Sequence, residues 1–396
     1  MCHVLFIPGS LSSMNLLRVP STARLLSTTS AARRMTTMAT ATTPTKATTQ
    51  KAVVIQGPGV AKLVTDRPIP RLRDDYILVK TAAVALNPTD WKHIQSRVRR
   101  AGPLVGCDYA GVVERVGPKV TKGFRPGDRI CGMAHGSNAV EPEDGTFAER
   151  IVVKGDTQIE IPRGVSFEEA ATLGVGITTV GQGLYQTLGM RLPSDDPPLK
   201  EEEEPVPVLI YGGSTATGTL GIQFAKLSGY TVLTTCSPRN AELVKAAGAD
   251  FVFDYNEADV GRRIREHTND KLRYAWDTIS LPASARICAE ALSSAPGGKY
   301  ASLGAVEFPR DDCSSAFTLA YTALGEAFTF GDIEIPAKPQ DYEFAKMFWE
   351  LARELLTEGK IKAHPRRVRR GLEGVLDGLQ ELKDNKVSGE KLVYTL

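Results

Sequence analysis

The stretch Val208-Leu-Ile-Tyr-Gly-Gly-Ser-Thr-Ala-Thr-Gly218 decides the fold of this chain. An apolar strand over 208–211 runs directly into a glycine-rich turn, and we expect a helix over 219–227. This order is typical of a βαβ unit, in which a pyrophosphate lies at the helix N-terminus because free backbone N–H groups and the helix dipole favour anions. We expect side-chain hydroxyls to assist, because the middle of the turn consists of Ser214, Thr215, Ala216 and Thr217.

A second strand, predicted over 230–235, indicates which nucleotide is bound. NAD-binding units commonly place an acidic residue at the end of this strand, where it binds the ribose hydroxyls. Here no acid is present, and the strand is followed by Ser237, Pro238, Arg239 and Asn240. Hydroxyl donors and a guanidinium suit a 2′-phosphate, so we predict NADPH rather than NADH. The alternative is a tight strand-to-helix turn that binds nothing.

Length and composition limit the class of protein. The 396 residues suffice for two domains, and 42% hydrophobic and 24% charged residues are ordinary for a globular protein. A formal net charge of +2 and the lack of a zinc-finger pattern give no indication of nucleic-acid binding. The six cysteines form no C-x-x-C pair, which favours reduced thiols over a disulfide framework or a structural zinc site. No apolar run approaches the length of a membrane span.

The first fifty residues have a different composition. They contain no Asp or Glu, and arginines alternate with Ser, Thr, Ala and Leu, as in the segment 16–27. This composition is typical of a mitochondrial transit peptide. The alternatives are a disordered extension, or a true start at Met35 or Met38. We therefore predict a leader or disordered segment over 1–50, and a mitochondrial location if the leader is genuine or a cytoplasmic one if it is not.

The rest of the chain alternates between two patterns. Short β-rich pieces separated by Gly, Pro and Asp turns predict a mainly β domain over 51–170. Strands alternate with helices over 171–339, as in a doubly wound parallel sheet. A helix is predicted over 342–356 and a final strand over 392–396, and the segment 340–396 is expected to complete the first domain. The Pro- and Glu-rich stretch 192–207 is predicted to be a surface loop.

Several motifs in residues 51–396 resemble the medium-chain dehydrogenase/reductase superfamily. They are Ala85-Leu-Asn-Pro-Thr-Asp-Trp-Lys92, Gly106-Cys-Asp-Tyr-Ala-Gly-Val-Val-Glu114, Phe124-Arg-Pro-Gly-Asp-Arg-Ile130, Gly145-Thr-Phe-Ala-Glu149 and Lys386-Val-Ser-Gly-Glu-Lys-Leu-Val393. The resemblance implies an α/β protein with a GroES-like, mainly β catalytic domain and a Rossmann domain. The nucleotide motifs are similar to those of zinc-free fungal trans-acting enoyl reductases of the lovastatin type.

The resemblance also bears on metal binding. In the zinc alcohol dehydrogenases of the superfamily, a Cys stands at the position of Asn87 and a His-Glu pair at Cys107-Asp108. A catalytic zinc needs three protein ligands and an open position, and Asn87 is a poor ligand. We predict that no metal is bound, and that hydride passes to an acceptor that is already activated.

The expected acceptor is the C=C bond of a 2-enoyl thioester, carried as a polyketide intermediate on an acyl carrier domain. After hydride addition the enolate must be stabilised by donors and then protonated. The resemblance implies Lys92 and Thr178 as catalytic residues. It implies cofactor contacts at Pro88, Thr89, Asp90, Trp91 and Lys92, and beyond the two nucleotide motifs at Tyr255, Leu303, Gly304, Val387 and Ser388. It implies substrate contacts at Ile177, Thr178, Thr179, Val180, Phe317 and Tyr321.

Structural alternatives exist for several of these residues. Lys92 could be a surface lysine beside Trp91, Thr178 or Thr179 a helix cap, and Tyr255 a packed aromatic. The segment 317–321 could belong to the domain core. His135 is more simply structural, and the basic run 365–370 is more simply a solvated face than a docking site for an acidic carrier domain.

Two other functions remain open at this point. The first is an NADPH-dependent quinone or enone reductase, and the second is a non-catalytic NADPH-binding protein, because cofactor binding is not turnover. The expected partners are a small-molecule or carrier-bound acyl thioester and a polyketide synthase. We predict a monomer or a homodimer.

Overall fold

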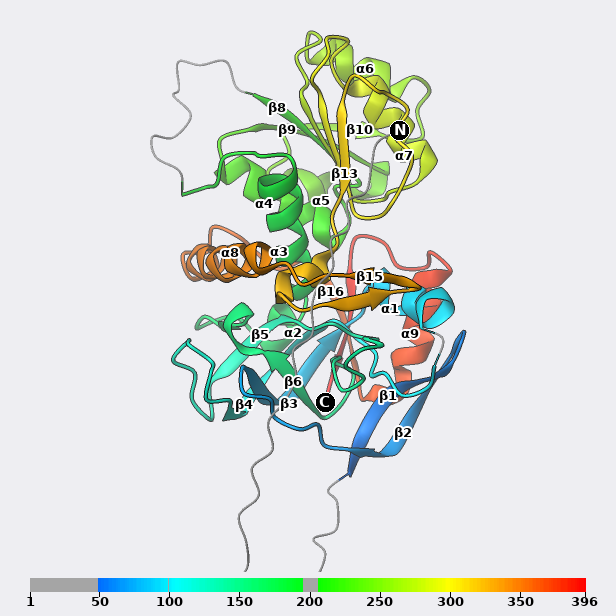
Figure 1. The fold of residues 1–396 in the computed structure, drawn as a ribbon. Coiled ribbons are helices and arrows are strands. Elements are labelled where there is room, and N and C mark those ends of the chain that lie inside the picture. Colours follow the sequence, from blue (N-terminus) through cyan, green and yellow to red (C-terminus); the bar gives the residue numbers. More distant parts are fainter. Residues whose placement is uncertain (1–48, 99, 195–205) are drawn as a thin grey trace, which may run out of the picture. The chain divides into compact units, whose positions relative to one another are not determined.

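The computed structural model describes residues 49–98, 100–194 and 206–396, all within one compact unit, Ala47–Leu396. Figure 1 shows two halves of this unit, each built on its own sheet. The leader, apart from its last two residues, and most of the acidic loop predicted over 192–207 lie outside the described residues. Each helix in the described ranges is too short or too polar to span a bilayer.

The first half is organised around a largely antiparallel sheet. Among the described residues it has seven strands, in the order β16-β17-β3-β4-β5-β7, with β6 paired to β3. The chain's final strand pairs antiparallel with β3. The strands are β3 (Tyr76–Ala85), β4 (Asp108–Val116), β5 (Arg129–Met133), β6 (Arg150–Lys154), β7 (Ile159–Glu160), β16 (Arg366–Arg370) and β17 (Lys391–Thr395).

A two-stranded ribbon opens the unit and extends the same half. It consists of β1 (Thr49–Gly57) and β2 (Val60–Pro68), and bridges from Ala52 to Ala148 and from Val54 to Leu104 attach it to the rest. Strand β1 begins two residues before the domain start predicted at residue 51. Its first two residues therefore lie in the segment 1–50, which was predicted to be a leader or disordered. The cause is Gln50, which is buried because its side-chain amide pairs with the backbone N–H and carbonyl of Arg150, at 2.6 and 2.9 Å.

The second half contains the predicted doubly wound sheet. Over the described residues, its strand order is β10-β9-β8-β11-β12-β13, with every neighbouring pair parallel. The order reverses between β8 and β11, which is where such sheets bind ligands at the carboxyl ends of their strands. The strands are β8 (Pro207–Tyr211), β9 (Thr231–Cys236), β10 (Phe251–Asp254), β11 (Tyr274–Asp277), β12 (Lys299–Ser302) and β13 (Ser314–Phe317).

Side chains of these strands point alternately to the two faces of the sheet, and helices cover both faces. Val208, Ile210 and Val232 share a core with α4 (Ala216–Leu227) and α5 (Ala241–Ala246). Leu209, Tyr211 and Leu233 point the other way, into a core with α6 (Val260–His267) and α7 (Pro282–Ala291). This period of two confirms a doubly wound sheet covered on both sides.

Helices α3 (Gly174–Val180) and α8 (Pro339–Thr357) lie side by side between the two halves (Figure 1). A side chain at Gly181 would collide with Phe348 of α8, so this glycine permits the close approach. The other α-helices of the described ranges are α1 (Pro88–Lys92), α2 (Phe167–Ala170) and α9 (Val375–Lys383). The predicted fold class is confirmed, whereas β2, β13 and the hairpin of β14 (Phe328–Phe330) and β15 (Ile333–Ile335) were not predicted.

Candidate active site

The glycine-rich turn has the geometry of a phosphate cradle. Gly212 has a φ of 80°, and a side chain at Gly218 would collide with the carbonyl oxygen of Gly212. Thr215 is the N-cap of α4 and its hydroxyl accepts from the Gly218 N–H at 2.8 Å. That hydroxyl is thus already used to start the helix, while Ser214 and Thr217 are only half-buried. The turn fits a pyrophosphate held by backbone N–H groups at the start of a twelve-residue helix.

The end of β9 brings together predicted cofactor residues from both halves. Asn240 donates from its side-chain amide to the Ser388 hydroxyl at 3.1 Å. Ser237, near Asn240 in the sequence, and Val387, next to Ser388, are half-buried, and Pro238 is exposed. Arg239 is exposed, and within the described part of the chain no carboxylate pairs with it. The chemistry of this donor set fits a 2′-phosphate.

Two further predicted contacts lie at strand ends of the same sheet. Tyr255, just after β10, is 41% exposed and its ring lies 6.5 Å from that of Tyr211. After β12, the Leu303 N–H donates to the Ser280 hydroxyl and the Ser302 hydroxyl donates to the Gly304 carbonyl, both at 2.9 Å. The loop of Leu303 and Gly304, which was predicted to contact the cofactor, is therefore hydrogen-bonded to Ser280 and Ser302.

A buried carboxylate at the end of β11 supports this loop. Asp277 is fully buried and accepts from the Ser280 N–H at 2.9 Å, the Ser284 hydroxyl at 2.6 Å and the Tyr300 hydroxyl at 2.8 Å. Burial, followed by the charge of Asp277, raises the pKa of Tyr300 far above its usual value. Asp277 was not predicted, because a carboxylate at a strand end gives no sign in the sequence of how many donors converge on it.

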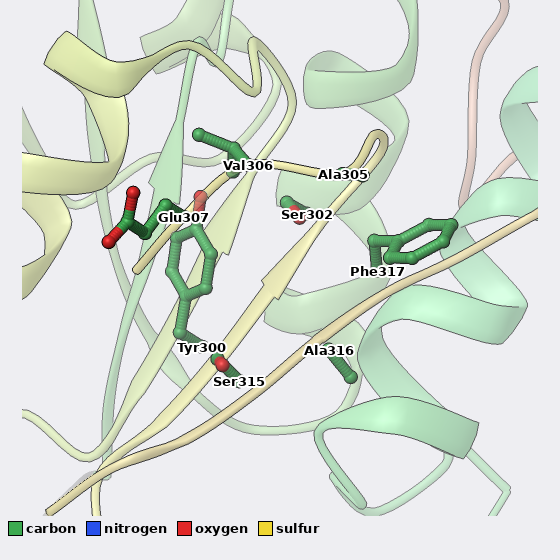
Figure 2. Close-up of a pocket in the computed structure, with 8 residues that line it drawn as sticks. All are labelled: Tyr300, Ser302, Ala305, Val306, Glu307, Ser315, Ala316 and Phe317. Atoms are coloured by element: carbon green, nitrogen blue, oxygen red, sulfur yellow. The ribbon is translucent and has the colours of Figure 1, made fainter. Parts of the chain in front are cut away.

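A cavity of about 410 Å³ opens at the carboxyl ends of β12 and β13 (Figure 2). Phe317, predicted to contact substrate, lies at one side of it and is 51% exposed. Its lining is mixed in polarity and includes Tyr300, Ser302, Ala305, Val306, Glu307 and Ala316. The cavity lies at the β12–β13 edge of the sheet, whereas the strand order reverses between β8 and β11.

Helix α1 places a second group of predicted residues. Pro88 and Lys92 are exposed, Trp91 is half-buried, and the Lys92 ammonium lies 5.7 Å from the centre of the Trp91 ring. Asp90 is placed differently from the prediction: it is 1% exposed, and its carboxylate accepts from the Asn87 N–H at 2.7 Å. Burial raises the pKa of Asp90 to about 7. The buried Asp90 side chain therefore helps to cap the N-terminus of α1, and it has almost no exposed surface for contact with a cofactor.

Tyr321 lies next to α1, away from the cavity that contains Phe317. Its hydroxyl is 2.8 Å from the Thr89 hydroxyl, and its ring stacks on His135 with the centroids 4.0 Å apart. Burial raises the pKa of Tyr321 well above 10, and burial together with His93 lowers the pKa of His135 well below 6.5. His135 is therefore a neutral packing partner at physiological pH, and Tyr321 remains protonated.

The positions that hold zinc in related alcohol dehydrogenases contain an internal cation. The Lys391 ammonium donates to Asn87 Oδ1 at 2.9 Å, to the Asp108 carboxylate and to the Thr172 carbonyl at 3.3 Å. Lys391 and Asp108 are 5% and 0% exposed. In the described ranges no three His, Cys, Asp or Glu side chains converge to hold a metal ion. The side-chain oxygens of Asn87 and Asp108 do not fit zinc, because the Lys391 ammonium already binds to them.

Helix α3 presents its predicted substrate residues mostly to the core. Ile177 and Val180 are fully buried in the apolar cluster between the halves, and Thr179 is 5% exposed. The Thr178 hydroxyl donates to the Gly174 carbonyl at 3.2 Å and accepts from the Trp349 indole at 3.1 Å. Ile177 and Val180 thus pack the core instead of facing substrate. The hydrogen bonds of Thr178 favour a role in joining α3 to α8 over the predicted catalytic role.

Comparison with known proteins assigns the family. A trans-enoyl reductase from Aspergillus sclerotiorum, resD, is 52% identical over 87% of this chain and 99% of its own length. The trans-enoyl reductase TOXD of Cochliobolus carbonum is 58% identical over 76% of this chain and 99% of its own length. The chain belongs to the trans-enoyl reductases. It is an oxidoreductase of the medium-chain dehydrogenase/reductase superfamily.

Domain families and solved structures agree with this assignment. The alcohol dehydrogenase GroES-like domain matches residues 73–163, and the zinc-binding dehydrogenase family matches 216–334. CurK enoyl reductase aligns over 87% of this chain and 99% of its own, with a TM-score of 0.66 and 19% identity. A quinone oxidoreductase from Pseudomonas syringae pv. Tomato DC3000 aligns over 88% and 100%, with a TM-score of 0.68 and 21% identity. At these identities, the structures show the shared fold.

Proposed function

We propose that this trans-enoyl reductase uses NADPH to reduce the C=C bond of a 2-enoyl thioester carried on an acyl carrier domain. The near full-length similarity to trans-enoyl reductases is the observation that supports the reaction. The substrate we infer is a polyketide intermediate of secondary metabolism, delivered by a synthase that is a separate chain.

The choice of NADPH rests on the end of β9. The Ser237 hydroxyl accepts from the Asn240 amide, which leaves its own hydrogen to donate, and Arg239 is a guanidinium to which no described carboxylate is paired. A ribose diol would call for an acceptor at this position, whereas a 2′-phosphate needs donors and positive charge. When bound, the reduced nicotinamide supplies the hydride.

The chain's own groups must then stabilise the enolate formed when hydride adds to the β-carbon. We assign this task to no metal, because the Lys391 ammonium already binds to the side-chain oxygens of Asn87 and Asp108. The candidates are donors on α1, where Thr89 is half-buried and Lys92 is exposed. Such donors lower the barrier when they are already directed at the position where negative charge develops.

The carrier partner is inferred from the reaction class and not from the basic run 365–370. The arginines of β16 are mostly paired within the chain: Arg366 with Glu169, Arg369 with Glu381, and Arg367 with Glu390. Internal neutralisation leaves little net charge to attract an acidic domain. The run is better explained as a solvated edge strand.

The test is a comparison of acceptors with protein that begins near Thr49. NADPH oxidation would be followed with a 2-enoyl pantetheine thioester and with an ortho-quinone, and each assay repeated with NADH and with a metal chelator. We expect turnover of the thioester with NADPH, at least tenfold faster than with NADH, and unchanged by the chelator. Turnover of the quinone alone would overturn the proposal.

A further inference from the structure

The segment that leads from α8 back to the first half is fastened to the phosphate-binding helix α4. This segment, residues 358–365, joins α8 to β16. His364 Nδ1 lies 2.8 Å from the Thr219 hydroxyl oxygen, and the two residues are 2% and 3% exposed. One turn further along α4, the Gln223 side-chain amide donates to the Lys362 carbonyl at 3.1 Å and accepts from the Lys362 N–H at 2.7 Å. The segment thus contacts α4 at two successive turns.

Thr219 lies in the first turn of α4, next to the groups expected to hold the pyrophosphate. The Thr219 N–H donates to the Thr215 carbonyl at 2.9 Å, a bond that closes this turn. The backbone N–H groups that favour a pyrophosphate belong to the same turn. A contact that fixes the Thr219 side chain therefore also restrains those N–H groups.

The same segment is bonded on its other side to the strand that begins at Lys391. The Lys391 N–H donates to the Pro365 carbonyl at 2.8 Å. Burial, followed by the charge of Lys391, lowers the pKa of His364 to about 4, so the imidazole is neutral at physiological pH. A neutral imidazole has one N–H and one acceptor nitrogen, so either member of the pair with Thr219 can donate. His364 therefore connects α4 to the part of the first half that contains the buried Lys391.

We propose that His364 is a positioning residue that, through Thr219, holds the start of α4 in the position that binds the pyrophosphate of the cofactor. This inference rests on the proposed function, because it requires a dinucleotide whose pyrophosphate lies at α4. His364 is too deeply buried to touch the cofactor, and it exchanges no proton with it. Its effect is therefore confined to ligands that contain the pyrophosphate.

The experiment compares His364→Leu, which removes the hydrogen bond, with His364→Asn, which keeps one. An Asn amide places a donor or an acceptor where the imidazole Nδ1 lies, so it can pair with the Thr219 hydroxyl in either direction. Calorimetric titration gives the Kd of NADPH, which contains the pyrophosphate, and of adenosine 2′-phosphate, which lacks it. We expect His364→Leu to raise the Kd of NADPH about fivefold, the effect of one hydrogen bond, and to leave the Kd of adenosine 2′-phosphate within about twofold. His364→Asn should bind NADPH within about twofold of the wild type.

A double-mutant cycle tests whether His364 acts through Thr219. Thr219→Val removes the hydroxyl with little change in shape, and it should raise the Kd of NADPH by a similar factor. The variant with both Thr219→Val and His364→Leu should bind NADPH no more weakly than the weaker single variant, because both changes remove the same bond. His267→Leu is the control: this exposed histidine contacts the ring of Phe251 at the start of β10, and its loss should leave both Kd values unchanged.

Thermal melting of each variant shows whether the fold is kept. If His364→Leu does not fold, Thr219→Val removes the same hydrogen bond from the side of the helix. Equal losses of affinity for NADPH and adenosine 2′-phosphate would overturn the proposal, because they would indicate a general disturbance of the second half. Wild-type affinity of His364→Leu for NADPH would overturn it, as would multiplicative losses in the double variant. If the wild type prefers NADH, the proposed cofactor fails, yet NADH contains the same pyrophosphate and the same cycle, with adenosine as the fragment, still tests His364.

Discussion

The buried corner around Lys391 and the exposed end of β9 use charge in opposite ways. At the corner, Lys391, Asp108 and Asn87 are each at most 6% exposed, and the Lys391 ammonium donates to side-chain oxygens of the other two. At the end of β9, Arg239 is exposed, and no carboxylate among the described side chains pairs with it. The difference shows that similar polar residues serve two purposes. Paired and buried charges fix the protein's own elements, and unpaired exposed ones are available to a ligand.

The corner joins parts that are far apart in the sequence. Lys391 belongs to β17 and Asp108 to β4, and the second oxygen of Asp108 accepts from the Val175 N–H of α3 at 2.6 Å. Asn87, which also accepts from Lys391, immediately precedes α1. The ion pair therefore positions both α1 and α3 relative to the sheet.

The largest predicted effect would come from breaking the buried pair. Lys391→Met leaves Asp108 charged, buried and without its cation, and should lower the free energy of unfolding by about 3–5 kcal/mol. Lys391→Met combined with Asp108→Asn removes both charges and should recover most of that loss. Urea unfolding of the three proteins measures this. A double variant as unstable as Lys391→Met alone would show that the charges do not act as a pair.

The next effect concerns Asp90 and depends on pH. Its folded pKa of about 7 exceeds the ordinary 3.8, so between these values the folded state holds a proton that the unfolded state has lost. The contribution of Asp90 to the free energy of unfolding therefore falls as pH rises from 4 to 7. The free energy of unfolding of Asp90→Asn, relative to that of the wild type, should therefore rise by up to about 4 kcal/mol between pH 4 and pH 8, at 1.36 kcal/mol per pKa unit.

Melting temperatures of both proteins across that pH range test the Asp90 prediction. The matched control is Asp74→Asn, a substitution at an exposed carboxylate, which should track the wild type at every pH. A constant difference between Asp90→Asn and the wild type would mean that Asp90 is ionised throughout.

A smaller effect tests the other region of the comparison. Arg239→Ala should weaken NADPH binding by about 1.5–3 kcal/mol, the value of a hydrogen bond to a charged group, and leave NADH binding unchanged. Equilibrium fluorescence titration with both cofactors measures it. Arg125→Ala, at another exposed arginine, is the control. Equal losses for the two cofactors would contradict a 2′-phosphate site at the end of β9.

The smallest effect is expected at the basic edge strand. Arg370→Ala should change kcat/KM by less than twofold with either a pantetheine thioester or a carrier-bound one, because the neighbouring arginines are neutralised within the chain. A loss above fivefold with the carrier-bound substrate alone would identify β16 as part of a docking surface.

Local patterns were sufficient to predict the fold class and many strands. Strands β5 and β11 lie within the regions where strands were predicted, because apolar runs ended by turn residues define them locally. Helix α4 begins at Ala216, three residues before the predicted start, since Thr215 and not a later residue provides the cap. The glycine-rich turn and the residues after β9 are likewise local, which is why sequence motifs locate them.

Side-chain roles set by distant partners could not be predicted. Asp90 was expected at the cofactor and is buried, and Ile177 and Val180 were expected at the substrate and lie in the core. Lys391 was not predicted as a partner of Asp108, which is 283 residues away in the sequence. The Tyr321–Thr89 contact spans 232 residues. Such pairings depend on how segments distant in the sequence fold together, and no periodicity or spacing reveals them.

The most direct test of the central claim follows the hydride itself. The protein would be incubated with a carrier-bound 2-enoyl thioester and NADPH labelled with deuterium at the transferable position, and the released acyl product examined by mass spectrometry and NMR. The account predicts a saturated product with one deuterium, at the β-carbon. An unreduced thioester, or deuterium only in a reduced quinone added to the same mixture, would contradict it.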